Sequence, residues 1–219
     1  MEKFSCLFIF LFIAMPGYSQ QDSLGIEPKL SVGLSYNTYR GDLGEGYQSG
    51  GLALQLSYIF GHEKRLHGGI HAAVGSFSGY ELRSEPLDFT TEVFPNNYFK
   101  ANFISVHYSL QYDIFRRANW LVYIRQGLGI MRFVPRDEQG NSLTDALETR
   151  ADNESYGNAT AILPTQAGVD YYLPNRLGLG LKLGWLNTTT DYLDNISLLG
   201  RRSGNDNIFQ LILQLHLPL

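Results

Sequence analysis

Apolar and polar residues alternate along most of this chain, in runs of about ten residues that begin near position 29. One run, residues 51–60, places large apolar side chains at every second position: Leu52, Leu54, Leu56, Tyr58 and Phe60. Small or polar residues fill the positions between them. Successive side chains of a β-strand point to opposite faces, so each run predicts a strand with one apolar face.

Eight runs show this pattern, and they cover residues 29–39, 50–60, 66–77, 98–115, 120–133, 159–172, 176–186 and 207–219. Short connections follow the second, fourth and sixth runs, and long connections follow the others. This alternation is typical of outer-membrane barrels, whose short turns face the periplasm. A soluble barrel would turn its apolar face inward and has no reason to sort its loops in this way. We therefore predict an all-β fold: one eight-stranded antiparallel up-and-down transmembrane β-barrel in the cell outer membrane, with both termini in the periplasm.

The first residues resemble a secretory signal, because Lys3 precedes an apolar run that ends at Met15 and small residues follow at Gly17 and Ser19. The run is too short to span a bilayer as a helix. We expect a signal peptide over residues 1–19 and a barrel domain over residues 20–219. Its removal would also remove Cys6, so the fold cannot depend on disulfides.

Composition narrows the choice of partner. The net charge of −4 argues against a nucleic-acid partner, and the 14 tyrosines suit the interface between lipid and water. We expect contact with outer-membrane lipid or lipopolysaccharide.

Charged residues occur in mid-strand, on the faces opposite the apolar ones: Asp113, Arg125, Asp170 and Lys182. In hydrocarbon each charge would cost several kcal/mol, whereas inside a narrow barrel the charges can pair with one another. These four residues predict a polar network in the lumen. Inward glycines fit a tight interior, so we expect a plugged barrel without a solute channel.

His107 and Ser109 lie two residues apart on one strand face, as a His-Ser pair does in outer-membrane lipid A deacylases. A lipid-cleaving site should face lipid, and this pair is predicted to face the lumen, so we interpret it as lumen filler. The histidines lack metal-ligand spacing. We expect no enzyme activity, cofactor or metal.

Two segments carry a family resemblance. The first is Tyr39-Arg40-Gly41-Asp42-Leu43, and the second runs from Thr189 through Asp191-Tyr192-Leu193-Asp194-Asn195-Ile196 to Ser197. With the tyrosine-rich fourth run, they resemble the PorG-type outer-membrane barrels of Bacteroidetes, which are associated with type IX secretion and gliding motility. The chain departs from that family at Asn195, where a second Asp is usual, and at Leu219, where a terminal aromatic residue is common.

The resemblance implies an accessory or anchoring role in the type IX secretion and gliding apparatus. The implied partners are periplasmic secretion-ring proteins and an associated lipoprotein. The alternatives are a free-standing barrel of the OmpA or OmpX kind and, least favoured, a lipid A-modifying enzyme.

Barrel closure makes the first and last long loops neighbours, because the first and last strands must pair. We therefore expect one cluster at the rim, formed by Tyr39, Gly41, Asp42, Leu43, Asp191, Tyr192, Asp194, Asn195 and Ser197. The cluster could contact a partner. It could equally be a loop-capping network of Asp and Tyr hydrogen bonds, which needs no partner and is the favoured interpretation for the individual residues.

Overall fold

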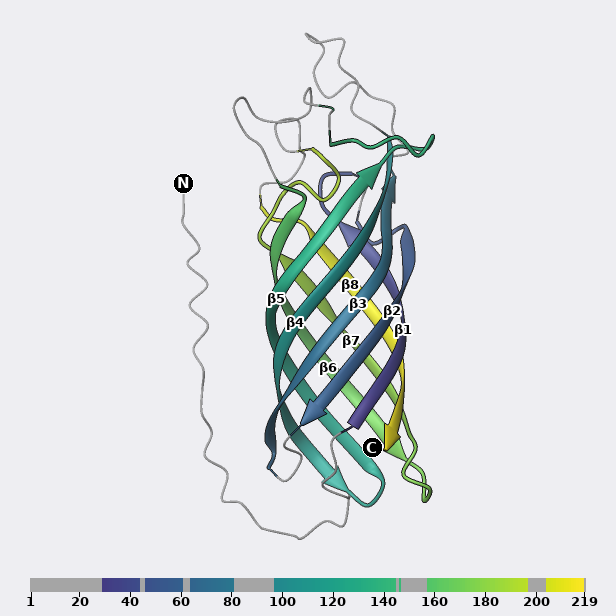
Figure 1. Cartoon of the computed structure of the whole chain (residues 1–219), viewed down its shortest axis with the longest axis vertical. Helices are drawn as coiled ribbons and strands as arrows, with labels where there is room; N and C mark the ends of the chain where they lie inside the picture. The colour runs from purple at the N-terminus through teal and green to yellow at the C-terminus, as the bar shows by residue number, and fades with distance from the viewer. Residues whose placement is uncertain are drawn as a thin grey trace.

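The computed structural model describes residues 29–43, 46–60, 64–80, 97–144, 146, 157–196 and 204–218. The predicted signal peptide lies outside these residues. The strands are β1 (Lys29–Arg40), β2 (Gly50–Phe60), β3 (Leu66–Tyr80), β4 (Tyr98–Arg117), β5 (Trp120–Arg136), β6 (Ala159–Tyr172), β7 (Gly178–Thr188) and β8 (Asn207–Pro218). Each strand pairs with its neighbours in sequence, and β1 pairs with β8, which closes the barrel (Figure 1). The predicted fold class is confirmed.

The strand boundaries differ from the predictions mainly at the long-loop end of the barrel. There β3 and β5 continue to Tyr80 and Arg136, beyond the ends read from the pattern, whereas at the short-turn end β4 continues to Arg117. The predicted seventh strand began at residue 176, but Arg176 has a φ of 67° and belongs to the preceding turn. A β-bulge between Asp113 and Phe115 interrupts the pairing of β4 with β5 near the opposite end.

The apolar faces of the strands point away from the barrel. Leu54 is 59% exposed and Ile130 is 66% exposed, whereas their strand neighbours Gln55 and Met131 are buried. The same contrast runs around all eight strands, so the wall presents a continuous apolar belt. An outward apolar belt is the surface that lipid requires, because hydrocarbon offers no hydrogen bonds to polar side chains.

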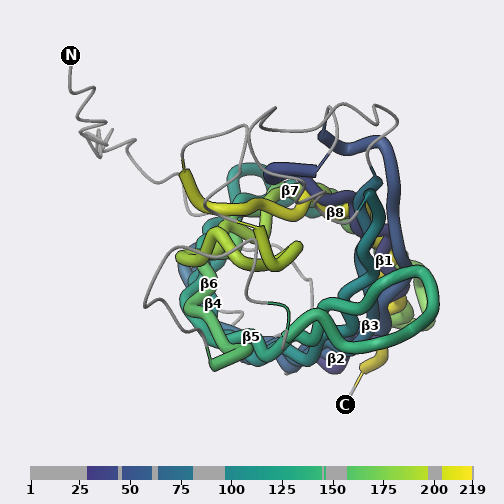
Figure 2. The backbone as a smooth tube through the Cα atoms, turned by 90° about the horizontal axis from the view of Figure 1, so that it is seen from above, coloured from purple at the N-terminus to yellow at the C-terminus, as the bar shows by residue number. Residues whose placement is uncertain are grey.

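The strand ends that the long connections join lie at one end of the barrel, and the ends joined by short turns lie at the other, where β1 begins and β8 ends (Figure 1). Figure 2 views the closed ring of strands from the long-loop end. Among the described residues, no helix is long and apolar enough to cross a membrane.

The lumen has two zones. Toward the long loops it is filled by a cluster of buried apolar side chains, which includes Phe77, Phe99, Phe103 and Phe133. Loop residues complete this cluster from above: Leu43, Leu143, Leu193 and Ile196. Toward the short turns, the buried side chains are mostly polar or charged. Side chains therefore fill the interior, in agreement with the predicted plug, although the apolar half of the plug was not predicted.

Candidate functional site

A buried cluster of loop residues covers the seam where β1 meets β8. We call it the cap, and it consists of Tyr39, Asp42, Asp194 and Asp206 with the loop residues that contact them. Its centre is Tyr39, which pairs with Ile208 across the seam and is 2% exposed. The connection that follows β1 and the connection that precedes β8 both reach this side chain. The predicted proximity of the first and last long loops is therefore observed.

The Tyr39 hydroxyl links the two connections. It lies 2.7 Å from Asp194 Oδ2 and 3.1 Å from Asp206 Oδ1, and it accepts a hydrogen bond from the Asp42 backbone N–H at 3.0 Å. A hydroxyl has one proton, so it donates to one of the two carboxyl groups at a time.

Backbone amides support the two carboxyl groups from the other side. The Ile196 N–H donates to Asp194 Oδ1 at 2.9 Å, and the Leu193 N–H donates to Asp206 Oδ2 at 2.8 Å. Asp194 and Asp206 thus hold their own loop as well as Tyr39, and both are almost fully buried.

Gly41 is required by this close packing. A Cβ at this position would lie 1.8 Å from the Tyr39 hydroxyl and 1.9 Å from Asp206 Oδ1, far inside contact distance. The cap therefore explains why glycine follows Arg40 in the first segment of the resemblance.

Burial raises the pKa of Asp194 to about 7, against an ordinary value of 3.8, because removal from water penalises the charged form. Burial also raises the pKa of Asp206, and the nearby Asp194 carboxyl raises it further. Two acids with raised pKa values around one hydroxyl favour a shared proton over two full charges.

The other predicted rim residues lie in or beside the cap. Leu43, Tyr192 and Asn195 are buried, and the Asn195 side chain donates to the Ala146 carbonyl at 2.8 Å, which ties in the third long loop. Asp191 is half-buried. Ser197 lies outside the described residues. Burial of most of these side chains favours the loop-capping interpretation over direct contact with a partner.

Asp206 was missed by sequence reasoning. It stands directly before β8, at the place that corresponds across the seam to the end of β1. Because the first and last strands pair, the residue that precedes the last strand must lie beside the end of the first. This reasoning could have predicted that Asp206 lies near Tyr39.

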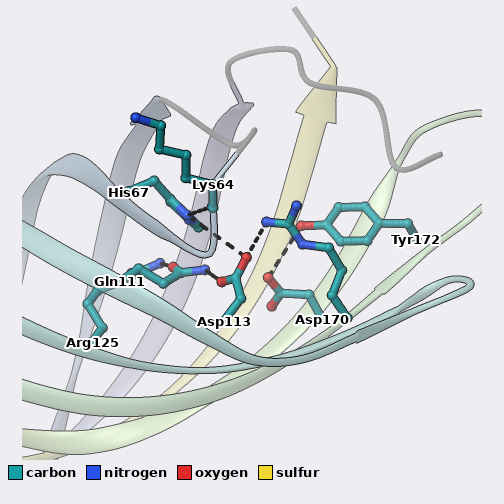
Figure 3. A network of polar contacts seen from close by, with 8 residues as sticks. Lys64, His67, Gln111, Asp113, Arg125, Asp170 and Tyr172 are labelled. Atoms are coloured by element: carbon teal, nitrogen blue, oxygen red, sulfur yellow. Dashed lines mark hydrogen bonds and ion pairs between the residues drawn. The ribbon is translucent and has the colours of Figure 1, made fainter. Parts of the chain in front are cut away.

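The polar zone of the lumen contains the four predicted charged residues, all buried. Asp113 accepts a hydrogen bond from Gln111 at 2.9 Å and forms a salt bridge with Arg116 (Figure 3). Arg125 donates to the other end of the Gln111 amide at 2.5 Å. The amide thus bridges Asp113 and Arg125, which form no salt bridge with each other.

Asp170 and Lys182 also have partners that were not predicted. Asp170 lies 3.2 Å from His216 Nε2, and the Tyr123 hydroxyl donates to it at 3.4 Å. Lys182 donates to Gln55 across the lumen at 3.4 Å. The four charged residues therefore belong to a polar network, but uncharged amides and an aromatic hydroxyl are their partners and they do not pair directly with one another.

His107 and Ser109 are not hydrogen-bonded to each other. Ser109 lies 2.7 Å from Nε2 of His71, whose Nδ1 lies 2.8 Å from the Ser57 hydroxyl. His107 stacks on the His71 ring, with centroids 4.7 Å apart. All four side chains are buried in the lumen, away from lipid. Within the described ranges, no group of three or more His, Cys, Asp or Glu side chains is arranged to hold a metal ion.

Comparison with known structures gives the fold its context. Neisserial surface protein A matches with a TM-score of 0.52 at 11% identity, over 88% of this chain and 97% of that one. The chain shares the fold of outer-membrane β-barrels.

Two further structures give weaker matches. The attachment invasion locus protein Ail of Yersinia pestis has a TM-score of 0.47 at 13% identity, over 87% of this chain and 96% of Ail. The outer membrane enzyme PagL has a TM-score of 0.45 at 16% identity, over 86% of this chain and 99% of PagL. At these identities the likeness concerns the barrel alone. No protein-family model and no curated protein matches the chain.

Proposed function

We propose that this chain is a non-enzymatic outer-membrane barrel that serves as an accessory or anchoring component of the type IX secretion and gliding apparatus. In this proposal the short turns and both termini face the periplasm. The partners are the periplasmic secretion-ring proteins and their associated lipoprotein, as the PorG-type resemblance implies.

The observation that carries the proposal is the cap. The two segments on which the resemblance rests are distant in sequence, yet the Tyr39 hydroxyl of one bonds the Asp194 carboxyl of the other. Gly41 of the first segment leaves the space that this contact needs. The two motifs therefore act as one structural unit.

The filled lumen supports an anchoring role over transport. Apolar side chains block the long-loop half, and loop residues Leu193 and Ile196 pack onto them. A barrel with a fixed cap and a packed interior is a rigid body, which suits a membrane attachment point.

Affinity purification tests the proposed partners. The tagged full chain is extracted from its native membrane in mild detergent, and the proteins that accompany it are identified by mass spectrometry. We expect secretion-ring proteins and a lipoprotein, at levels well above those obtained with an unrelated tagged barrel of similar size. A barrel that purifies alone, from cells whose type IX cargo is exported normally without it, would favour the free-standing alternative.

Complementation tests the absence of catalysis. In a deletion strain, the variant His107→Ala should restore cargo export as well as the unchanged chain does, and the acyl pattern of lipid A should stay the same. A change of lipid A acylation that depends on His107 would instead support the lipid-modifying alternative.

A further inference from the structure

Three cations point outward from β4 and β5 near the long-loop end of the barrel: Lys100, Arg132 and Arg136. The apolar belt of β4 begins at Ile104, which pairs with Arg132. Arg132 therefore stands at the edge of the belt, and the other two cations stand beyond it. This is the level at which a lipid headgroup meets the wall.

The placement of these three cations is electrostatically unfavourable, because like charges lie close together. Lys100 and Arg136 are direct register partners, and direct partners on one face have Cβ atoms about 4.5–5.5 Å apart. Like charges so placed repel each other. Among the described residues, no carboxylate forms a salt bridge with any of the three. Their combined field attracts an anion from outside the barrel.

A groove of about 520 Å³ adjoins these charges on the outer wall and crosses β2 to β5. Its lining is mainly apolar, with Leu52, Val74, Ile104 and Val134, and Arg132 lies within it. Such a hollow accepts an acyl chain, while Arg132 is placed to meet the phosphate at the head of that chain.

We propose that this face binds a phosphorylated glycolipid of the surrounding leaflet, with its phosphates on Lys100, Arg132 and Arg136 and an acyl chain in the groove. Arg132 and Arg136 are four residues apart, which separates their Cα atoms by roughly 13 Å. Lys100 and Arg136, as direct register partners, can share one phosphate, and Arg132 then meets the second phosphate of a disaccharide headgroup, which a phospholipid with a single phosphate lacks. The proposal depends on the long loops facing the outer leaflet and is independent of any role in secretion.

The test uses the full chain, purified in detergent and titrated with bisphosphorylated lipid A. The test variant combines Lys100→Gln, Arg132→Gln and Arg136→Gln. The control variant combines Lys64→Gln, Arg65→Gln and Arg117→Gln, which removes the same charge from exposed positions at the short-turn end. A shift of gel mobility on heating in SDS confirms that each variant is folded.

We expect the test variant to bind lipid A at least about tenfold more weakly, because each basic side chain near an anionic lipid surface contributes about 1 kcal/mol. The control should bind as the unchanged chain does. Phosphatidylglycerol should bind the unchanged chain more weakly than lipid A. Equal losses in the two variants, unchanged binding by the test variant, or equal affinity for the two lipids would each overturn the proposal.

Discussion

At the scale of single residues, the cap depends on one hydroxyl. Tyr39 joins two carboxyl groups and one backbone amide that come from both sides of the seam. Its ring also packs edge-on against Phe99, with centroids 4.7 Å apart, so the same side chain belongs to the apolar zone below. The hydroxyl of Tyr39 is therefore held by polar contacts, and its ring is held separately by apolar packing.

Tyr39→Phe keeps the ring and removes the hydroxyl, so it isolates the polar contribution. Hydrogen bonds to charged groups contribute about 1.5–3 kcal/mol, and we expect the cap to lose a comparable amount while the barrel stays folded. Amide hydrogen exchange at Leu193 and Ile196 measures this loss. Tyr36→Phe is the matched control, because Tyr36 lies on the same strand and faces outward. Unchanged protection in Tyr39→Phe would show that the hydroxyl does not hold the cap.

The raised carboxyl pKa values give the cap a dependence on pH. Between its ordinary pKa of 3.8 and its pKa of about 7 in the cap, Asp194 binds more protons in the closed state than in an open one. The closed cap therefore loses stability as pH rises through this window, and the loss is complete above it. The raised pKa of Asp206 acts in the same direction.

We expect the Leu193 and Ile196 amides to be more protected at pH 5 than at pH 8, after correction for intrinsic exchange rates. Asp194→Asn should reduce the difference, because an amide does not titrate. Protection that is equal or greater at pH 8 would contradict the shared-proton interpretation.

At the scale of elements, alternation predicted all eight strands, because lipid outside and a narrow lumen inside impose opposite demands on neighbouring positions. This reasoning did not predict the apolar zone of the lumen near the long loops. Phe99 and Phe103 occupy the inward positions of β4 that the pattern marks as polar or small, and loop residues cover them only in the folded chain.

The candidate site was predicted in part for a similar reason. Closure of the barrel placed Tyr39 near Asp194, and the two segments could be named from sequence. The part of Asp206 as a second partner of the Tyr39 hydroxyl depends on side-chain geometry at the seam and was not predicted. The sequence predicted the four charged members of the lumen network but not their partners, because Gln111 and His216 carry no charge that marks them in the sequence.

The apolar zone should contribute more to stability than the outer belt does. Phe99 is fully buried within protein, so Phe99→Ala should cost about 3–5 kcal/mol. Ile130→Ala removes a side chain that faces lipid, and lipid can fill the space, so its cost should be clearly smaller. Denaturant unfolding of the barrel in vesicles measures both. Equal costs would mean that the zone is loosely packed.

At the scale of the whole molecule, closure and filling are separate properties, and each has its own measurement. A closed barrel resists SDS until it is heated, so the unheated protein should migrate differently from the heated one. A filled lumen should show no steady conductance across a planar bilayer. A stable pore would mean that the apolar zone opens, even if the gel shift is present.

The position of the cap on the seam sets the order in which this protein can mature. Tyr39 belongs to the first strand, whereas Asp206 directly precedes the last, so their contact cannot form until the final segment has been synthesised and paired. The cap is therefore a late event that marks completion: a chain stalled with an open seam would keep both carboxyl groups in water and fully ionised. Proteolysis within the last loop would then distinguish finished barrels from unfinished ones.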